Sequence, residues 1–388
     1  MEMTATMFTP SAMRVKRSPI ERVSALIGQG TINLAGGSPD PSLIPLEKLR
    51  EAYTQIIEEY GAKSFFYPGA GGLDQLIHQL KKWCATLDIG GGEIIVTSGA
   101  QHAITQLCAA LLSAQDAYVH ENPTFVETMN SFLFYSPQGE PVAVDDQGIQ
   151  TSILESRLKT RKSPPKLLYT VPTAHNPSGV TMSEERRKHL VELAQKYGFT
   201  IIEDDPYRPI SKPTRTLYSM SPENVVYVGS LSKALAPGLR IGFVLTTSHA
   251  LAEKLRDLEQ MDFSTSTVNQ LVTAKILESD LIQSKLGDLR EHYASKMRLM
   301  LESLRENGLE PIYQPQDGFF CLVNTNTYAE ELLLKAVKLG VAFVPASEFY
   351  FDNTGHTNIR LSIGPVDKSL IPEGVNRLVK ALNQNEQA

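Results

Sequence analysis

Residues 166–207 read KLLYTVPTAHNPSGVTMSEERRKHLVELAQKYGFTIIEDDPY, and this stretch decides the fold. The runs KLLYTV (166–171) and TIIEDD (200–205) are short and rich in β-forming side chains, as buried strands are. Between them, SEERRKHLVELAQKYG (183–198) has the apolar spacing of a helix. The stretch therefore predicts a strand–helix–strand unit in which the two strands run parallel.

The same alternation extends in both directions along the chain. Five further short runs predict strands: EIIVTS (93–98), AYVHEN (117–122), PVAVD (141–145), NVVYVGS (224–230) and IGFVLT (241–246). Helical stretches separate most of them, for example LEKLREAYTQIIEEYG (46–61) and ALAEKLRDLEQ (250–260). We therefore expect an α/β fold with a mostly parallel, seven-stranded sheet sandwiched by helices.

The C-terminal third has a different pattern. A helix-rich stretch (268–307) is followed by GFFCLVN (318–324), a helix near 328–339, VAFVPAS (341–347) and NIRLSIG (358–364), which indicate a smaller α+β unit. We predict an N-terminal arm (1–45) that packs on the small domain, a large domain (46–275) and a small C-terminal domain (276–388).

Composition excludes several classes of protein. The 388 residues include 42% apolar and 21% charged residues, as in ordinary globular proteins, and suit two domains. The net charge of −6 does not favour binding to nucleic acid or to anionic membranes. Three separated cysteines have no metal-ligand spacing, so we expect no metal site. No signal peptide or apolar run of membrane-spanning length is visible, and a cytoplasmic location is the default expectation.

Polar residues follow two strands at their carboxyl ends, where parallel sheets bind ligands. Asp204 and Tyr207 lie three apart in EDDPY (203–207), so one turn can bring both to one ligand. Asn176 precedes Pro177 in HNPSG (175–179), which keeps it out of the helical region and projects its amide from the loop. Each of these two motifs also occurs in ordinary loops that bind no ligand.

Two further loops carry groups that suit a phosphate. In SLSKALAPGLR (230–240), Ser230, Ser232 and Arg240 offer two hydroxyls and a guanidinium fork, and Lys233 lies where it can attack a carbonyl. In TSGAQ (97–101), a strand ends and a helix is expected to begin at about Ala100. The free backbone N–H groups in the first turn of such a helix form an anion site. A plain strand–helix junction would look the same.

Arg360 interrupts the apolar run NIRLSIG. An arginine stays charged, and its burial is costly without an acidic partner. A substrate carboxylate or an internal salt bridge would each provide that partner.

The order of these motifs is more specific than any one of them. Pyridoxal 5′-phosphate (PLP) needs an acid near its pyridine nitrogen, a lysine for its aldehyde and fixed donors for its phosphate. The motifs supply all three, and Arg360 adds a carboxylate-binding group from a separate domain. We therefore expect PLP as the cofactor.

The sequence resembles the fold-type I, class I/II aminotransferases. It is most similar to the branch that contains 2-aminoadipate and kynurenine aminotransferases and the effector domains of MocR-type regulators. The resemblance covers about residues 18–383 and rests on an ordered series of motifs: LAGGSPDPSLIP (34–45), YPG (67–69), TSGAQ, ENPTF (121–125), HNPSG, EDDPY, SLSKALAPGLRIGF (230–243) and NIRLSIG.

The resemblance implies a transaminase that moves an amino group from an L-amino acid to a 2-oxo acid by a ping-pong mechanism, through an internal aldimine at Lys233. Lys233 would move the substrate proton, Asp204 would pair with the pyridine nitrogen, and Tyr207 would bond the ring oxygen O3′ with Asn176. The implied cofactor-binding residues are Gly99, Ala100, Gln101, Phe125, Asn176, Asp204, Tyr207, Ser230, Ser232, Lys233, Arg240 and Tyr67.

The resemblance also implies substrate contacts and an assembly. Gly37, Asn176 and Arg360 would contact the substrate, and Arg360 would bind its α-carboxylate. Tyr67 would reach the phosphate of the neighbouring subunit's site, which implies a homodimer with shared active sites.

Three positions depart from the family pattern. The relatives often have Ser or Thr at Ala100 and Tyr at Phe125, so this chain lacks two hydroxyls near the cofactor. They often carry an arginine after the opening Ser-x-Ile of the N-terminal helix, where this chain has Glu21 followed by Arg22. We hypothesise that an acidic donor side chain is less favoured here and that a basic or neutral one fits.

Two alternatives remain open. The same fold and cofactor residues would serve a β-lyase, a decarboxylase or another amino-acid-modifying enzyme. A ligand-sensing regulatory domain is the alternative from another class, although only about 17 residues precede the resemblance, too few for a DNA-binding module.

Overall fold

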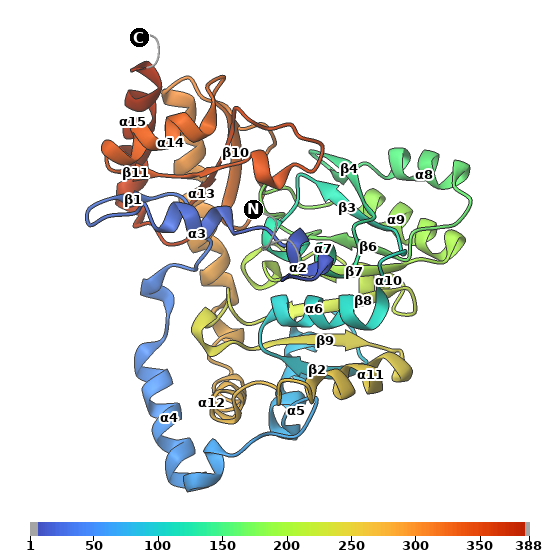
Figure 1. Cartoon of the computed structure of the whole chain (residues 1–388). Coiled ribbons are helices and arrows are strands. Elements are labelled where there is room, and N and C mark those ends of the chain that lie inside the picture. Colours follow the sequence, from blue (N-terminus) through green and yellow to red (C-terminus); the bar gives the residue numbers. More distant parts are fainter. Residues whose placement is uncertain (1–6, 385–388) are drawn as a thin grey trace.

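The computed structural model describes residues 7–384, and its largest feature is an eight-stranded sheet of order β2-β9-β8-β7-β6-β3-β4-β5 (Figure 1). The strands from β8 to β4 are parallel neighbours, whereas β9 runs antiparallel to β2 and β8. Their bounds are β2 (Glu93–Thr97), β3 (Tyr118–Asn122), β4 (Gly139–Asp145), β5 (Gly148–Ile149), β6 (Leu167–Thr170), β7 (Thr200–Asp204), β8 (Val225–Ser230) and β9 (Gly242–Thr246).

The seven predicted strands are all present, and the α/β prediction is confirmed. The eighth strand, β5, was not predicted. It is two residues long and pairs antiparallel with β4 at the sheet edge. Two residues are too few for a period-2 pattern, so the sequence carries no strand signal there.

Both faces of this sheet are buried, and each has its own core. Ile94 and Val225 belong to one cluster, whereas their chain neighbours Ile95 and Val226 belong to the other, because successive strand side chains face opposite sides. Helices α6 (Ala100–Leu111), α7 (Val126–Tyr135) and α11 (His249–Glu259) pack on the cluster that contains Ile95 and Val226. The other core includes α5 (Asp74–Thr86), α8 (Thr151–Thr160), α9 (Glu184–Tyr197), α10 (Leu217–Met220) and α12 (Thr267–Glu278).

A smaller unit follows in the C-terminal third. Its antiparallel sheet has the order β10-β13-β12, with β10 (Phe320–Asn324), β12 (Val344–Pro345) and β13 (Asn358–Ser362). Three helices accompany this sheet (Figure 1), namely α13 (Leu286–Glu306), α14 (Ala329–Lys338) and α15 (Ile371–Asn383). Seven short 3₁₀ helices lie at 41–43, 61–65, 208–210, 237–239, 283–285, 347–349 and 368–370 within the described residues.

The N-terminal segment lies against both units. β1 (Ile32–Asn33) pairs in parallel with β11 (Val341–Ala342) of the C-terminal unit. The short helix α2 (Pro10–Arg14) instead contacts α7, where Arg14 donates hydrogen bonds to the carbonyls of Leu133 and Phe134. Helix α3 (Pro19–Ser24) follows, capped by Ser18.

Residues 1–6 and 385–388 of the proposed arm and small domain lie outside the described residues. We retain 1–45, 46–275 and 276–388 as proposed domain limits, and the second boundary falls near the end of α12. Helix α4 (Leu46–Tyr60) begins the large domain and extends along α12 (Figure 1). Within 7–384, every helix is too short or too polar to cross a membrane.

Candidate active site

A cavity of about 170 Å³ lies at the carboxyl ends of β7 and β8, next to the first turn of α6. Ten of the predicted site residues line it: Ala100, Gln101, Phe125, Asn176, Asp204, Tyr207, Ser230, Ser232, Lys233 and Arg240. Ile104, Thr128, Val171 and Pro206 complete the lining. Residues from five separate loops and helix ends therefore meet in one place, as the order of the motifs predicted.

Asp204 ends β7 and is buried at the floor of this cavity. Its Oδ2 accepts a hydrogen bond of 2.8 Å from the hydroxyl of Tyr169, while its Oδ1 has no partner. Burial raises the pKa of Asp204 to about 7, and the charge of Asp205 adds to this rise, whereas Tyr169 and Lys233 act to lower it. A buried oxygen without a partner is costly, so Oδ1 is suited to receive a proton donor from a ligand.

Lys233 lies in the loop after β8, and its Nζ donates a hydrogen bond of 2.7 Å to the carbonyl of Gly37. The rings of Tyr207 and Phe319 lie 5.8 and 5.9 Å from Nζ. Burial lowers the pKa of Lys233 to about 8, and the positive charges of Arg360 and Arg240 contribute. A lysine with such a pKa has a substantial neutral fraction near neutral pH and can act as a nucleophile or base.

The first turn of α6 is the end of the cavity that is suited to an anion. Gly99 is the N-cap at φ 87°, a region that favours glycine, and Arg240 Nη2 donates to the carbonyl of Ser98 at 3.0 Å. A Cβ built on Gly99 would lie 2.6 Å from Arg240 Nη2, so a side chain there would displace the arginine. Ala100 and Gln101 follow with the free N–H groups that a helix start offers to an anion.

Arg360 reaches this region from β13 of the smaller sheet. Its side chain is completely buried, donates to Asn176 Oδ1 at 3.0 Å and to the carbonyl of Ala35 at 2.6 Å, and leaves Nε without a partner. The rings of Phe320 and Phe349 lie 4.5 and 5.1 Å from its guanidinium carbon.

The internal salt bridge considered for Arg360 is absent, because none of the acidic groups in residues 7–384 lies within ion-pair distance of it. Burial lowers its pKa to about 10, with the charges of Tyr207 and Glu127 acting in the opposite direction. A buried cation without a counter-charge is suited to bind a carboxylate.

Tyr207 and Phe125 line the cavity, and Gly37 adjoins it through its hydrogen bond with Lys233. Tyr207 packs edge-on against Phe319 and Phe320, and burial raises the pKa of its hydroxyl. Phe125 is the N-cap residue of α7 and is half-buried. A Cβ on Gly37 would meet the ring of Phe320 at 3.5 Å, which is ordinary contact, so the carbonyl of Gly37 matters more here than its missing side chain.

Gly37, Gly99 and Arg360 lie beside the cavity in contact with lining residues, whereas the predicted site residue Tyr67 lies away from it. It is 82% exposed, and its ring lies 5.1 Å from that of Phe263 in a separate surface depression. Glu21 is also exposed and lies 3.9 Å from Arg17, whereas Arg22 forms an ion pair with Glu348.

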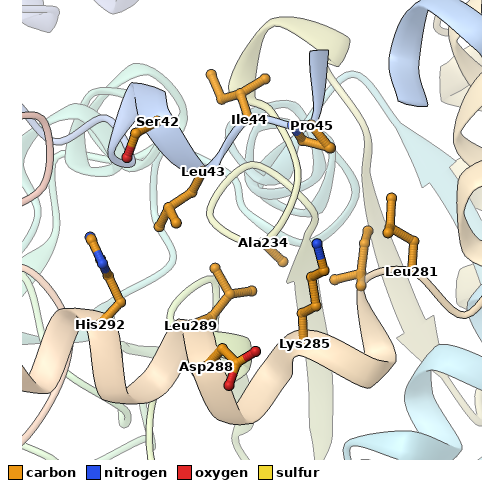
Figure 2. Close-up of a pocket in the computed structure, with 11 residues that line it drawn as sticks. Ser42, Leu43, Ile44, Pro45, Ala234, Leu281, Lys285, Asp288, Leu289 and His292 are labelled. Carbon is orange, nitrogen blue, oxygen red and sulfur yellow. The ribbon is translucent and has the colours of Figure 1, made fainter. Parts of the chain in front are cut away.

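A second cavity, of about 350 Å³, borders the other side of the lysine loop at Ala234 (Figure 2). Leu43, Ile44 and Pro45 form one wall, and the side chains of Leu281, Lys285 and Leu289 form the wall opposite. This apolar cavity was not predicted, since its walls come from segments far apart in the sequence.

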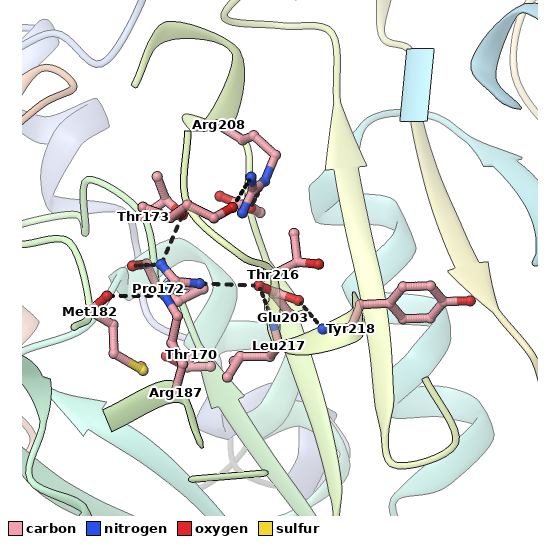
Figure 3. A network of polar contacts seen from close by, with 12 residues as sticks. Thr170, Pro172, Thr173, Met182, Arg187, Glu203, Arg208, Thr216, Leu217 and Tyr218 are labelled. Carbon is pink, nitrogen blue, oxygen red and sulfur yellow. Dashed lines mark hydrogen bonds and ion pairs between the residues drawn. The ribbon is translucent and has the colours of Figure 1, made fainter. Parts of the chain in front are cut away.

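A buried ionic network that was not predicted from the sequence connects two of the loops that line the cavity (Figure 3). Arg187 on α9 donates to the carbonyls of Met182 and Pro172, in the segment that carries Asn176, and lies 3.6 Å from the carboxylate of Glu203. Glu203, the residue before Asp204, accepts the backbone N–H groups of Leu217 and Tyr218 at 2.9 and 2.8 Å.

A second buried ion pair lies directly after the end of β7. Asp205 pairs with Arg208 in the turn that carries Tyr207. The three acidic residues of EDD therefore have different roles. Glu203 and Asp205 bond to neighbouring segments of the chain, whereas Asp204 faces the cavity. Only the density of acidic residues in EDDPY could have signalled this arrangement.

The chain matches known proteins over nearly its whole length. The family model "Aminotransferase class I and II" matches residues 29–378. Aromatic-amino-acid aminotransferase 1 of Thermococcus litoralis is 30% identical over 392 residues, covering 97% of this chain and 94% of that protein. The family match spans every cavity residue described above.

Solved structures agree closely with the fold. The kynurenine aminotransferase of Pyrococcus horikoshii, in complex with PMP, has a TM-score of 0.92 and 32% identity, and the match covers 99% of each chain. The α-aminoadipate aminotransferase LysN of Thermus thermophilus, complexed with N-(5′-phosphopyridoxyl)-L-leucine, has a TM-score of 0.90 and 27% identity, again over 99% of each chain. The prediction of a fold-type I architecture is confirmed.

Proposed function

The chain belongs to the aminotransferase class I and II family, and from that premise we propose that it transfers an amino group from an L-amino acid to a 2-oxo acid with PLP bound covalently at Lys233. The observation that carries this proposal is the pair of groups in one cavity: a lysine whose pKa is lowered to about 8 and a buried Asp204 with an oxygen lacking a partner.

The residues of the cavity fit this cofactor. Asp204 Oδ1 would accept the pyridine N–H, Phe125 would cover the ring, and Asn176 and Tyr207 would hydrogen-bond its O3′ oxygen. Its phosphate would bind the start of α6 with Gly99, Ala100, Gln101, Ser230, Ser232 and Arg240. When bound, PLP supplies an electron sink that labilises the bonds to the substrate Cα.

The remaining steps fall to side chains of the chain itself. Arg360 would bind the α-carboxylate of the substrate and so fix which Cα bond stands perpendicular to the cofactor ring. Once the substrate amine has taken its place on the cofactor, the freed Nζ of Lys233 would accept the proton from Cα, since burial and two nearby arginines make this amine easily neutral. Asn176 accepts a hydrogen bond of 3.0 Å from Arg360. This bond would hold the amide of Asn176 and the guanidinium of Arg360 in a fixed position relative to each other.

We propose a ping-pong order. Arg360 is the one cation proposed to bind a substrate carboxylate, so the donor and the acceptor would compete for the same group. We propose that the amino donor leaves as a 2-oxo acid before the acceptor binds to the same arginine.

We further propose a homodimer with shared active sites. Tyr67 is exposed together with Phe65, Phe66, Met261 and Phe263, an apolar group of side chains that a second copy would cover. The hydroxyl of Tyr67 would then reach the phosphate in the partner's cavity.

The donor class is proposed from the charges around α3. Arg22 is neutralised by Glu348, and Glu21 faces solvent beside Arg17, so no unpaired cation from these residues is available for a distal carboxylate. We propose that basic and neutral donors are preferred over 2-aminoadipate and glutamate. A steady-state panel of these donors with one 2-oxo acid tests this order, and a preference for the dicarboxylic donors would refute it.

Two measurements test the reaction itself. Purified protein should show a visible absorption band that shifts when an amino donor is added, and borohydride reduction should leave a pyridoxyl group on the peptide that contains Lys233. A Lys233→Ala variant should lose the adduct and turnover, while Lys285→Ala, which changes a lysine of the neighbouring cavity, should keep both. An adduct-free wild-type peptide after incubation with excess PLP would refute the proposal.

The dependence of turnover on a 2-oxo acid distinguishes a transaminase from the other PLP enzymes. A transaminase turns over only when a 2-oxo acid is present, whereas a β-lyase or a decarboxylase does not need one. A ligand-sensing domain would bind PLP or an amino acid without turnover in either assay.

A further inference from the structure

Tyr169 is a completely buried tyrosine in the middle of the large sheet, in the predicted strand KLLYTV (166–171), and the sequence analysis gave it no role in the site. It lies on β6, and its register partner on the parallel strand β7 is Ile202. Asp204 lies two residues beyond Ile202 and therefore projects from the same face of the sheet as Tyr169. The strand register brings the phenol to the carboxylate.

The hydroxyl of Tyr169 donates to Asp204 Oδ2 at 2.8 Å. Within residues 7–384, it is the one side chain that hydrogen-bonds this carboxylate. The Tyr169 ring is fixed in turn by Phe132 of α7, with ring centroids 5.4 Å apart. Because a carboxylate held at one oxygen has a defined plane, the direction of the free Oδ1 is set by Tyr169.

The other charges around Asp204 make this bond important. Burial, Asp205 and Glu121 each act to raise the pKa of Asp204, whereas only Tyr169 and Lys233 act to lower it. The contribution of Lys233 depends on its positive charge, which is absent whenever this amine, with its pKa lowered to about 8, is deprotonated. Tyr169 then remains as the neighbouring group that favours the ionised carboxylate.

We propose that Tyr169 is a positioning residue of the proposed PLP site, which holds the carboxylate of Asp204 by one hydrogen bond and directs its second oxygen at the ring nitrogen of the cofactor. The inference rests on the proposed cofactor only for this last part. The link between Tyr169 and the ionisation of Asp204 is a property of the cofactor-free protein.

The first experiment therefore uses the cofactor-free protein. The side-chain carboxyl of Asp204 is followed by carbon-13 NMR during a pH titration of the wild type, of Tyr169→Phe and of Tyr118→Phe. Tyr118 is an apt control, because it is also completely buried and packs against the same Phe132 ring at 4.8 Å. Tyr169→Phe should raise the pKa of Asp204 by about one unit, a tenfold change in its ionisation constant, and Tyr118→Phe should leave it unchanged.

The second experiment adds PLP and measures its dissociation constant by spectral titration. Tyr169→Phe should weaken PLP binding about fivefold at pH 7, because less of Asp204 is ionised, and the loss should approach about tenfold as the pH falls. Replacement of Tyr169 by 3-fluorotyrosine, a stronger donor of almost the same shape, should lower the pKa of Asp204 below that of wild type. This variant keeps the test decisive even where Tyr169→Phe unfolds the protein.

Equal pKa values of Asp204 in wild type, Tyr169→Phe and the fluorotyrosine variant would overturn the inference, whatever their activity. A wild-type protein that binds no PLP would instead refute the proposed function and leave the NMR result intact.

Discussion

Arg360 and Asn176 are joined by a hydrogen bond of 3.0 Å, although one lies in a strand of the small sheet and the other in a loop of the large one. The two groups proposed to bind the substrate are therefore connected across the two units before any substrate arrives. Arg360 uses its Nη1 for this bond and its Nε has no partner, so the guanidinium retains a free donor.

We predict that Arg360→Lys raises the KM for both the amino donor and the 2-oxo acid about 10- to 100-fold, because an ammonium cannot make the paired hydrogen bonds of a guanidinium. Steady-state kinetics with each substrate in turn checks this result. The binding of a simple amine without a carboxylate serves as the control, and it should be unaffected. Unchanged KM values for both acids would contradict the role of Arg360.

The lowered pKa of Lys233 predicts how cofactor attachment depends on pH. Below about pH 8 the amine of the cofactor-free protein is mostly protonated and cannot attack an aldehyde, so the rate should rise with pH and level off above about pH 8. Stopped-flow absorbance after mixing with PLP measures this rate.

The same assay tests the electrostatic cause. Arg360→Met removes the charge that contributes most to the shift after burial, so the midpoint should move to higher pH. Arg298→Met, which changes an exposed arginine paired with Glu291, should leave it in place. A midpoint that is the same in all three proteins would exclude this cause.

Shared active sites predict that two inactive variants complement each other. Tyr67→Ala and Lys233→Ala should each have little activity, since each damages both sites of its own dimer. In mixed dimers one site combines an intact Lys233 with an intact partner Tyr67, so co-expression should restore about a quarter of wild-type activity for random pairing in a two-fold dimer. Separate expression followed by simple mixing without exchange is the control, and it should restore none.

Asp40 predicts acid sensitivity of the fold. Burial acts to raise its pKa, but hydrogen bonds from the buried Lys296, from Ser42 and from His292 outweigh burial and hold the pKa of Asp40 well below its usual range. An acid with a lowered pKa in the folded state adds stability at neutral pH, and this stability is lost as the pH falls below about 4.

We therefore expect Asp40→Asn to lower the free energy of unfolding by about 3 kcal/mol at pH 7, because the Lys296 ammonium stays buried without a counter-charge. The difference from wild type should shrink below about pH 4. Urea unfolding at several pH values measures both effects. Asp257→Asn, which breaks the exposed pair with Lys254, should change stability by less than about 0.5 kcal/mol.

The sequence predicted those parts of the molecule whose signals are local. Strand and helix periodicity gave the seven long strands, and loops such as HNPSG and EDDPY gave cavity residues, because turn-forming residues and polar groups stand out after apolar runs. β5 was missed because it is too short, and helix α2 falls in a segment that the sequence left as a loose arm.

Residues that act through the fold could not be recognised in the same way. Tyr169 in LLYT and Arg187 in a charged helix look like a core aromatic and a surface cation. Their importance depends on strand register and helix rotation, which bring Tyr169 to Asp204 and Arg187 to Glu203. Tyr67 remains a prediction for the opposite reason, since its proposed partner lies in another copy of the chain.

The pairing of β1 with β11 has a consequence for biosynthesis. Ile32 leaves the ribosome early, but its neighbour in the sheet, Val341, is made near the end of translation. The segment whose Gly37 carbonyl contacts Lys233 therefore stays without its sheet partner while the whole large sheet is synthesised. A nascent chain that stalls before residue 341 would carry every proposed phosphate-binding residue, yet it would lack both Arg360 and the strand that secures Gly37 beside Lys233.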